Sequence, residues 1–179
     1  MKNNRKWEID ATKRVAEIMC ASARTAPKAK GIDNIETLIL SEEQKELVIA
    51  EMKRIAMEEK VETMKKTFLR DANNLEESHQ VVIIGTRLKT IGISYCNYCG
   101  FENCSANKKA GGVCFFNSND LGIAVGSAVS IAGLNHIDNR IMYTVGRAII
   151  NLKLLGEDVK LALGIPLSVT GKSPFFDRG

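Results

Sequence analysis

The run Gln80-Val81-Val82-Ile83-Ile84-Gly85 has an unbroken apolar centre. A strand that covers a core with one face alternates apolar and polar residues, whereas a strand covered on both faces stays apolar along its length. The run therefore predicts an interior β-strand, packed on both sides, at the centre of a sheet.

The cysteine-rich part of the sequence follows this strand. Cys96, Cys99, Cys104 and Cys114 have the spacing C-x2-C-x4-C-x9-C, so four of the five cysteines lie within nineteen positions. Four thiolates can hold Zn²⁺ in a tetrahedral site, or they can ligate an iron–sulfur cluster. The spacing predicts a metal centre, and reduced cysteines or disulfides without a metal are the remaining alternative.

The spacing also bears on which metal is bound. Structural zinc sites commonly use two C-x2-C pairs, and the second half of this run has no such pair. The run Cys96-x-x-Cys99-Gly100-x-x-x-Cys104, with Cys114 after a shorter interval, resembles the [4Fe-4S] domains of corrinoid iron–sulfur proteins and of the ferredoxin-like subunit of membrane electron-transfer complexes. This resemblance implies one [4Fe-4S] cluster, with zinc as the alternative metal.

Small residues around the cysteines suit a loop that folds back on a cofactor. Gly100 can adopt a positive φ that turns backbone N–H groups toward a cluster, and Gly111-Gly112 lets the chain return to the fourth cysteine. We expect the aromatic side chains of Tyr95, Phe101 and Phe115 to cover the site.

Two more strands and a helical segment are predicted around this centre. A strand over 35–40 leads into a long amphipathic helix, which Ser41 opens together with Gln44 in a capping-box arrangement. A second, charged helix follows it. The third strand is expected over 159–165 and to end at Pro166.

Three further helices are predicted. The first runs over about 10–26, and we expect its Cys20 to be a packed thiol rather than a ligand. A helix rich in small residues, capped by Asn119 or Asp120, is suited to burial or to a subunit contact, because another backbone can approach it closely. The last helix is expected over 140–155.

Composition limits the classes of protein that this chain can belong to. With 179 residues, 45% hydrophobic and 26% charged, the chain suits one folded domain. The net charge of +4 and the absence of a basic run with interleaved aromatics argue against nucleic acid as a partner. Residues 1–10 do not read as a signal peptide, and no apolar run approaches the length of a membrane span. We therefore expect a cytoplasmic protein without a membrane partner.

Two features that could suggest catalysis do not support it. Gly171-Lys172-Ser173 looks like the end of a phosphate-binding P-loop, but Pro166 stands where the motif needs glycine, and Pro174 prevents the helix that must follow. The two histidines, His79 and His136, suggest no pairing of a base with a nucleophile. For His136 we expect a capping or core role.

Several segments together resemble an uncharacterised prokaryotic family that is described as proteins containing a ferredoxin domain. The segments are residues 23–31, the cysteine loop, residues 120–128, and residues 164–168 with 174–178. The likeness extends over most of the chain and implies an iron–sulfur protein, without implying a particular reaction.

A more distant resemblance is to the flavin nitroreductases. They carry an Ala-Pro-Ser type turn after an N-terminal helix, then an Asp-x-Gly-x-Ala helix and a late Gly-aromatic-Pro strand end. Here the matching residues occur in that order: Ala26-Pro27, Asp120, Gly122, Ala124, Gly164 and Pro166. The resemblance implies an α+β fold with a mixed sheet flanked by helices, a homodimer with a shared interface, and FMN at that interface.

The flavin-phosphate contacts of nitroreductases are not preserved in this sequence. Their Arg-x-Ser-x-Arg run, which would supply bidentate guanidinium donors, is replaced by Lys13-Arg14 followed by Val and Ala. Arg24, Lys28 and Lys30, near the Ala-Pro turn, are the remaining candidates for contacts to a flavin phosphate, and a solvated role is the alternative for each.

These features together predict one α+β domain over residues 1–179, with a four-cysteine loop inserted at 93–119. The predicted function is that of an iron–sulfur redox protein, of electron-transfer or reductase type, that acts with an unidentified redox partner. If the protein is an enzyme, we expect an oxidoreductase. The alternative is a non-enzymatic module in which a structural four-cysteine zinc or iron–sulfur site organises the loop for partner binding.

Overall fold

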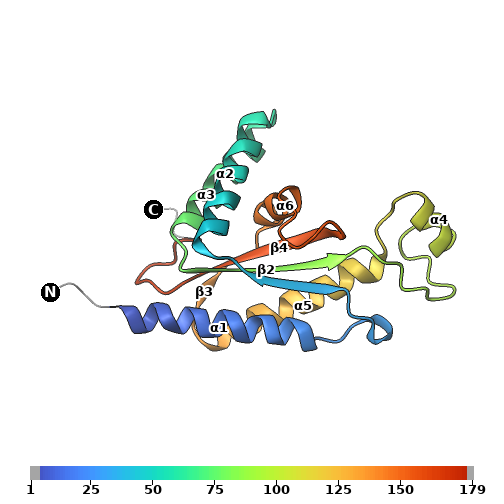
Figure 1. The fold of residues 1–179 in the computed structure, drawn as a ribbon, viewed down its shortest axis with the longest axis horizontal. Helices are drawn as coiled ribbons and strands as arrows, with labels where there is room; N and C mark the ends of the chain where they lie inside the picture. The colour runs from blue at the N-terminus through green and yellow to red at the C-terminus, as the bar shows by residue number, and fades with distance from the viewer. Residues whose placement is uncertain (1–4, 177–179) are drawn as a thin grey trace.

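The computed structural model describes residues 5–176 and has the α+β class that the sequence predicts (Figure 1). Asp177 and Arg178, which belong to the C-terminal segment of the family resemblance, lie outside the described residues. The elements are α1 (Lys6–Thr25), a 3₁₀ turn (Ala29–Gly31), β1 (Ile35–Ile39), α2 (Glu42–Glu58), α3 (Glu62–Glu76), β2 (Gln80–Arg87), α4 (Cys104–Lys109), α5 (Phe115–Leu134), β3 (Asp138–Asn139), α6 (Tyr143–Asn151) and β4 (Val159–Ser168).

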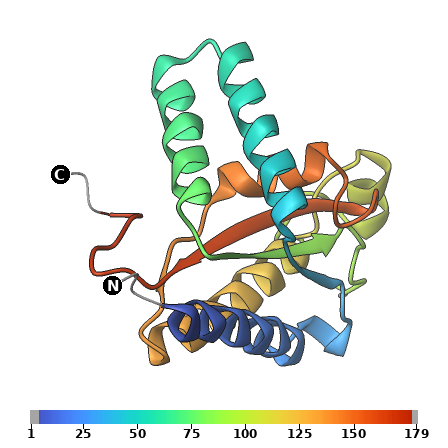
Figure 2. The same ribbon diagram turned by 60° about the vertical axis from the view of Figure 1, so that its left-hand side comes forward.

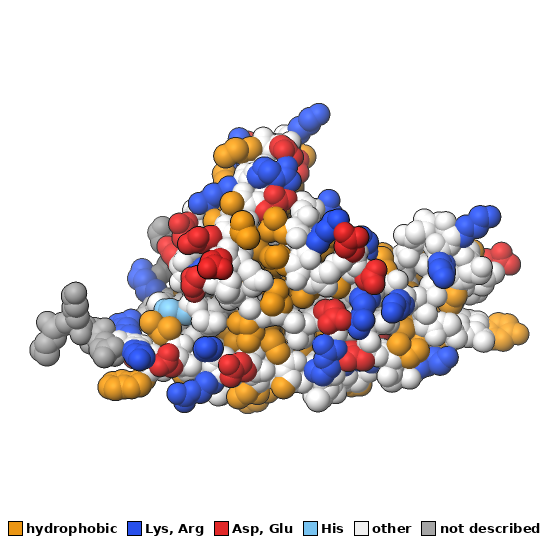
Figure 3. All heavy atoms as spheres, in the orientation of Figure 1, with side chains coloured by type: hydrophobic (Ala, Val, Ile, Leu, Met, Phe, Trp, Pro, Cys, Tyr) orange, Lys and Arg blue, Asp and Glu red, His pale blue; other side chains and the backbone are white. Residues whose placement is uncertain are grey.

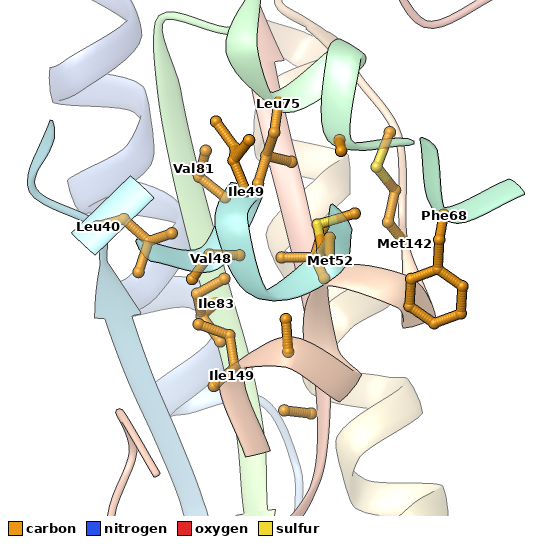
Figure 4. Close-up of a cluster of buried hydrophobic side chains, with 14 of the residues drawn as sticks. Leu40, Val48, Ile49, Met52, Phe68, Leu75, Val81, Ile83, Met142 and Ile149 are labelled. Atoms are coloured by element: carbon orange, nitrogen blue, oxygen red, sulfur yellow. The ribbon is translucent and has the colours of Figure 1, made fainter. Parts of the chain in front are cut away.

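The central strand β2 is covered on both faces, as its apolar run predicts. Val81 and Ile83 face a core formed with α2, α3 and α6, which Figure 4 shows in close-up. Val82 and Ile84 face a second core, formed with α1 and α5. Because successive strand residues point to opposite faces, one strand contributes to both cores, and full burial of each such side chain stabilises the fold by about 1.5–3 kcal/mol.

The strand order in the described sheet is β1-β2-β4-β3, and its three pairings are antiparallel, where the sequence predicts a mixed sheet. The connection between β1 and β2 gives the physical reason for the first pairing. The helices α2 and α3 form a hairpin that projects from the body (Figure 2), so the chain returns to the end of the sheet that it left. A strand that starts at that end must run antiparallel to its neighbour.

Several element boundaries differ from the sequence-based expectations. Helix α1 begins at Lys6 rather than near Asp10. Strand β4 continues through Pro166 to Ser168. Pro166 lies opposite Val81 of β2. The Val81 carbonyl points away from β4, because it accepts the N–H of Leu40 on the other side of β2. In an antiparallel ladder the N–H and C=O of one residue point the same way, so the missing Pro166 N–H removes no bond to β2.

The small-residue helix and the last helix also differ from the predictions. Helix α5 begins at Phe115, ahead of the expected caps Asn119 and Asp120. Asp138 and Asn139 pair with β4 as the short strand β3, and α6 spans only Tyr143–Asn151. The predicted capping box at Ser41 is confirmed, with both of its hydrogen bonds to Gln44 present.

Candidate functional site

The cysteine lobe, which we define as residues 88–114, connects the end of β2 to the start of α5 and contains the short helix α4. Figures 1 and 3 show that it stands out from the end of the molecule toward which β2 points. The insertion expected at 93–119 thus comprises most of this lobe and the first turn of α5.

All four candidate ligands line one cavity of about 640 Å³. Cys96, Cys99 and Cys104 are half-buried, and Cys114 is buried. Other residues of the segment 90–107, together with Phe115, form the rest of the wall. In the part of the chain that the structure describes, no three histidine, cysteine, aspartate or glutamate side chains are grouped so that they could hold a metal ion. The thiols therefore share a cavity wall without converging on one point.

One aromatic contact joins the lobe to the start of α5, and another lies within the lobe. The ring of Tyr98 packs edge-to-face on Phe115, with ring centroids 5.3 Å apart. Phe101 lies so close to Gly112 that a Cβ there would stand 2.7 Å from the ring. Glycine is therefore required at position 112 for the segment that carries Cys114 to approach the earlier cysteines.

The backbone between the first cysteines turns sharply, because Tyr95, Asn97 and Gly100 all have positive φ. The positive φ predicted for Gly100 is confirmed at +79°, and its N–H donates to the Asn97 carbonyl at 3.0 Å. The expected cover by Tyr95 is wrong, because this side chain is fully exposed. Tyr95 still lines the cavity together with Phe101 and Phe115, but its exposed ring does not cover the thiols.

Cys114 is the N-cap residue of α5, a consequence of the early start of that helix. Its carbonyl accepts the N–H of Asn117 at 3.0 Å. The remaining N–H groups of a helical first turn favour nearby negative charge, as does the helix macrodipole. The fourth candidate ligand therefore lies at the N-terminal end of α5, without a side-chain hydrogen bond to the helix.

The expected flavin-phosphate residues have other roles in this structure. Arg24 forms an ion pair with Asp33 at 2.6 Å. The Lys28 Nζ group donates to the carbonyls of Arg24 and Ala26, at 2.6 and 2.8 Å, and so caps the end of α1. Lys30 is exposed on the 3₁₀ turn, with φ of 55°. Two of the three cations are therefore engaged within the chain.

Two segments that carry the nitroreductase resemblance contact one another. Asp120 on α5 is buried and accepts the backbone N–H of Ala29 at 3.1 Å, close to the Ala26-Pro27 turn. Burial raises the pKa of the Asp120 carboxyl, against the lowering effects of this N–H and of Lys28. The contact fixes the start of α5, and with it Cys114, against the end of α1.

The remaining cysteine and the two histidines have structural positions. Cys20 packs at the edge of the core between α1 and α5, as predicted, and burial raises the pKa of its thiol. His136 follows α5 with φ of 55° and donates its N–H to the Gly133 carbonyl, which confirms the capping role. His79 Nδ1 accepts the N–H of Val169 at 3.2 Å.

Sequence reasoning missed α4 and two asparagines beside the cysteines. Asn103 caps α4 through a 2.9 Å bond from the Ala106 N–H, and this residue type was the available signal for a helix start. Asn107 and Asn117 are both 1% exposed. Nothing in the sequence distinguishes them from surface asparagines, since their burial depends on how the lobe packs on α5.

The described chain has the nitroreductase fold. A nitroreductase with bound FMN from Bacteroides fragilis NCTC 9343 superposes with a TM-score of 0.64 and 11% identity, over 88% of this chain and 77% of that one. A nitroreductase with bound FMN from Desulfitobacterium hafniense DCB-2 gives a TM-score of 0.64 and 12% identity, over 89% and 78% of the two chains. At these identities the likeness concerns the fold alone.

The family is defined by sequence. Residues 110–178 match the model of a family described as "Uncharacterized protein containing a ferredoxin domain". An uncharacterized protein of Archaeoglobus fulgidus is 42% identical over 98% of this chain and 96% of its own length. The chain belongs to this family of proteins containing a ferredoxin domain, as its sequence segments predict.

Proposed function

We propose that this protein is an iron–sulfur redox protein in which Cys96, Cys99, Cys104 and Cys114 ligate one [4Fe-4S] cluster. The observation that carries the proposal is that all four thiols line a single cavity. Membership of a family of proteins described as containing a ferredoxin domain supports an iron–sulfur role, and the residues matched to the family model, 110–178, include Cys114. When bound, a cluster of this kind supplies one-electron transfer, so the proposed role is electron transfer or reduction of a partner or substrate.

The size and lining of the cavity favour a cluster over a zinc ion. A structural zinc site is a closed tetrahedron of ligands around one ion, whereas these thiols are spread along the wall of an open cavity of about 640 Å³ and do not converge on one point. Ile93, Phe101 and Phe115 give the cavity apolar surface beside the thiols. Low solvent exposure and backbone N–H groups near the sulfurs are the means by which a protein sets a cluster's potential. Here the first turn of α5 would contribute at Cys114.

The proposal includes a homodimer formed through the outer face of α5. The only charged residue of α5 is Asp120, which is buried, so the exposed face of this helix is uncharged. Gly122, Gly126 and Gly133 lie on it with open space around them, which allows another backbone to approach closely. The nitroreductase resemblance implies a homodimer of this general kind.

FMN binding by this protein remains a prediction. It rests on the two nitroreductases of similar fold whose structures contain bound FMN. Arg24 and Lys28 do not fit a phosphate in this structure, because an ion pair with Asp33 and helix-end carbonyls already engage them. Release of FMN fluorescence on denaturation of the purified protein tests this prediction.

The test of the cluster is a visible spectrum with metal and sulfide analysis after anaerobic purification. We expect a brown protein with about four irons per chain, as the cluster type requires. Cys104→Ala should lose most of the iron, whereas Cys20→Ala, a thiol outside the lobe, should keep it. Colourless protein with stoichiometric zinc would refute the cluster, and a Cys104→Ala variant with full iron would refute the ligand assignment.

A further inference from the structure

Helix α4 ends in a turn at two glycines. Gly111 has a φ of +67°, the left-handed conformation in which many helices end. Its N–H donates to the Lys108 carbonyl at 3.2 Å, and the N–H of Gly112 donates to the Asn107 carbonyl at 2.9 Å. This pair of hydrogen bonds defines a Schellman motif. The segment that leads to Cys114 is therefore attached to α4 where it begins.

A side-chain hydrogen bond extends this attachment to the residue before Cys114. Asn107 is the buried residue of α4, with 1% of its surface exposed. Its Nδ2 group donates to the Val113 carbonyl at 3.1 Å. A Cβ at Gly112 would stand 2.9 Å from the same Nδ2 group, so glycine leaves room for this side chain. Asn107 thus bonds to Gly112 through its backbone and to Val113 through its amide.

The segment 110–113 has no other hydrogen-bonded anchor in the described structure. Each hydrogen bond that these residues form with another residue between 5 and 176 joins them to α4. Cys114 itself belongs to the start of α5, where its carbonyl accepts the N–H of Asn117. The position of Cys114 is therefore fixed from one side by α5 and from the other by α4, chiefly through Asn107.

Asn107 also lies between two of the proposed ligands. It comes three residues after Cys104, the first residue of α4, and residues at this spacing lie on the same side of a helix. It lines the cysteine cavity and an adjoining cavity of about 450 Å³, and Cys114 lines both as well. Asn107 therefore joins the helix that begins at Cys104 to the segment that ends at Cys114.

The chemistry of this contact requires an amide. Because the Val113 carbonyl accepts, the side chain at 107 must donate. Aspartate has the same size but would set an oxygen against the carbonyl oxygen. Leucine would leave the carbonyl without its partner, which is costly away from water. Glutamine adds a methylene group to a side chain that is already buried.

We propose that Asn107 is a positioning residue that holds Cys114 in place as the fourth ligand of the redox centre. Asn107 is not itself a ligand and acts through the segment that carries Cys114. The attachment of this segment to α4 rests on its hydrogen bonds alone, whereas the role toward a cluster rests on the proposed function.

Two matched substitutions test the role by the rate of iron loss from the anaerobically purified protein to excess EDTA. Asn107→Asp removes the donor to Val113. Asn103→Asp makes the same change in the same lobe, beside Cys104, but keeps an oxygen that accepts the Ala106 N–H.

We expect Asn107→Asp to lose iron about tenfold faster than the wild type, because it lacks one buried hydrogen bond. Asn103→Asp should lose iron at about the wild-type rate. Equal rates in the two variants would overturn the proposal.

Hydrogen exchange measured by mass spectrometry tests the attachment itself, whether or not iron is bound. The amides of 110–113 should exchange about tenfold faster in Asn107→Asp than in the wild type, and at the wild-type rate in Asn103→Asp. Peptides from β2 report on the whole fold and should be unchanged. Faster exchange throughout Asn107→Asp, or unchanged exchange at 110–113, would overturn the proposal.

The electron paramagnetic resonance spectrum of the reduced protein tests the role toward the cluster, because a bond of purely structural importance would leave it unchanged. We expect the spectrum to change in Asn107→Asp and not in Asn103→Asp. Faster exchange at 110–113 with an unaltered spectrum and unaltered iron loss would refute the positioning role. A wild-type protein without iron, combined with faster exchange in Asn107→Asp, would refute the proposed function while supporting the attachment, so the two failures are distinguishable.

Discussion

His79 shows how a single partly buried hydrogen bond makes stability depend on pH. Its Nδ1 accepts the Val169 N–H, which requires this nitrogen to be unprotonated. Burial lowers the pKa of the imidazole, and the nearby Lys45 lowers it further. The folded state therefore keeps His79 neutral at a pH where the same imidazole in the unfolded chain already begins to bind a proton.

The sign of the pH dependence follows from this difference. Stability rises with pH wherever the unfolded state binds more protons. The His79 contribution should thus be constant above the ordinary histidine pKa of about 6.5 and should decline as the pH falls below it. Urea unfolding midpoints measured at about pH 7.5 and about pH 5.5 test this expectation.

Two variants isolate the His79 effect. His79→Asn supplies an oxygen that can accept the Val169 N–H without titrating, so it should show a smaller loss of stability on acidification than the wild type. His136→Asn, at the exposed end of α5, controls for replacing a histidine. If the wild type and His79→Asn lose the same stability, the account of His79 is wrong.

At the scale of elements, α6 packs very closely on β4. A Cβ on Gly146 would stand 1.7 Å from the Ala162 carbonyl oxygen, and a Cβ on Gly164 would stand 2.2 Å from Val145. The absence of side chains at these two glycines lets α6 lie directly on the strand. This contact positions α6 over the core that it shares with α2 and α3.

Gly146→Ala should therefore destabilise the protein, although alanine is the better helix former. The added methyl group would overpack the contact and displace α6 from β4. We expect this to lower the free energy of unfolding by about 3 kcal/mol. Gly133→Ala, on α5 with open space around it, should change stability by about 1 kcal/mol or less. Chemical denaturation of both variants checks this, and an unchanged stability of Gly146→Ala would contradict the close contact.

Local sequence signals predicted the strands well and some helix ends poorly. The apolar run at 80–85 and the capping box at Ser41 depend on neighbouring residues, and both are confirmed. The two-residue strand β3 forms because β4 lies beside it, so no local sequence pattern predicts it. The early start of α5 likewise has no strong cap residue, since Cys114 occupies the N-cap without a side-chain bond.

The part of the candidate site that depends on local sequence spacing was predictable, and the part that depends on tertiary contacts was not. Cysteine spacing identifies the four thiols that line the cavity, because ligand spacing is a property of the sequence. The roles of Arg24 and Lys28 could not be predicted, since they depend on Asp33 and on the carbonyls at the end of α1. The unpartnered amide atom of Asn117 appears only once the lobe packs on α5.

At the scale of the whole molecule, the sheet separates two different surfaces. The helical hairpin α2–α3 projects on one side and carries many charges, while α1 and α5 cover the other side (Figures 1 and 2). The uncharged outer face of α5 adjoins the cysteine lobe through Cys114. A dimer formed on this face would bring the lobe of each subunit near the interface region.

Gly126→Arg tests this arrangement, because it places a charge at the middle of the α5 face without a clash inside the subunit. We expect the variant to be monomeric in light scattering coupled to size exclusion, since an unpaired charge in an interface is costly. Met57→Arg, at the exposed tip of the helical hairpin, should stay dimeric. A dimeric Gly126→Arg variant would place the interface elsewhere.

No helix among residues 5–176 is both long and apolar enough to cross a membrane.

The central claim is that the four thiols of the cysteine lobe hold a single cluster. Native mass spectrometry of the anaerobically purified protein measures this most directly, because it weighs the bound group intact. We expect one added mass of a [4Fe-4S] cluster per chain, absent in Cys104→Ala. An added mass of one zinc ion per chain, or a cluster retained in Cys104→Ala, would contradict it.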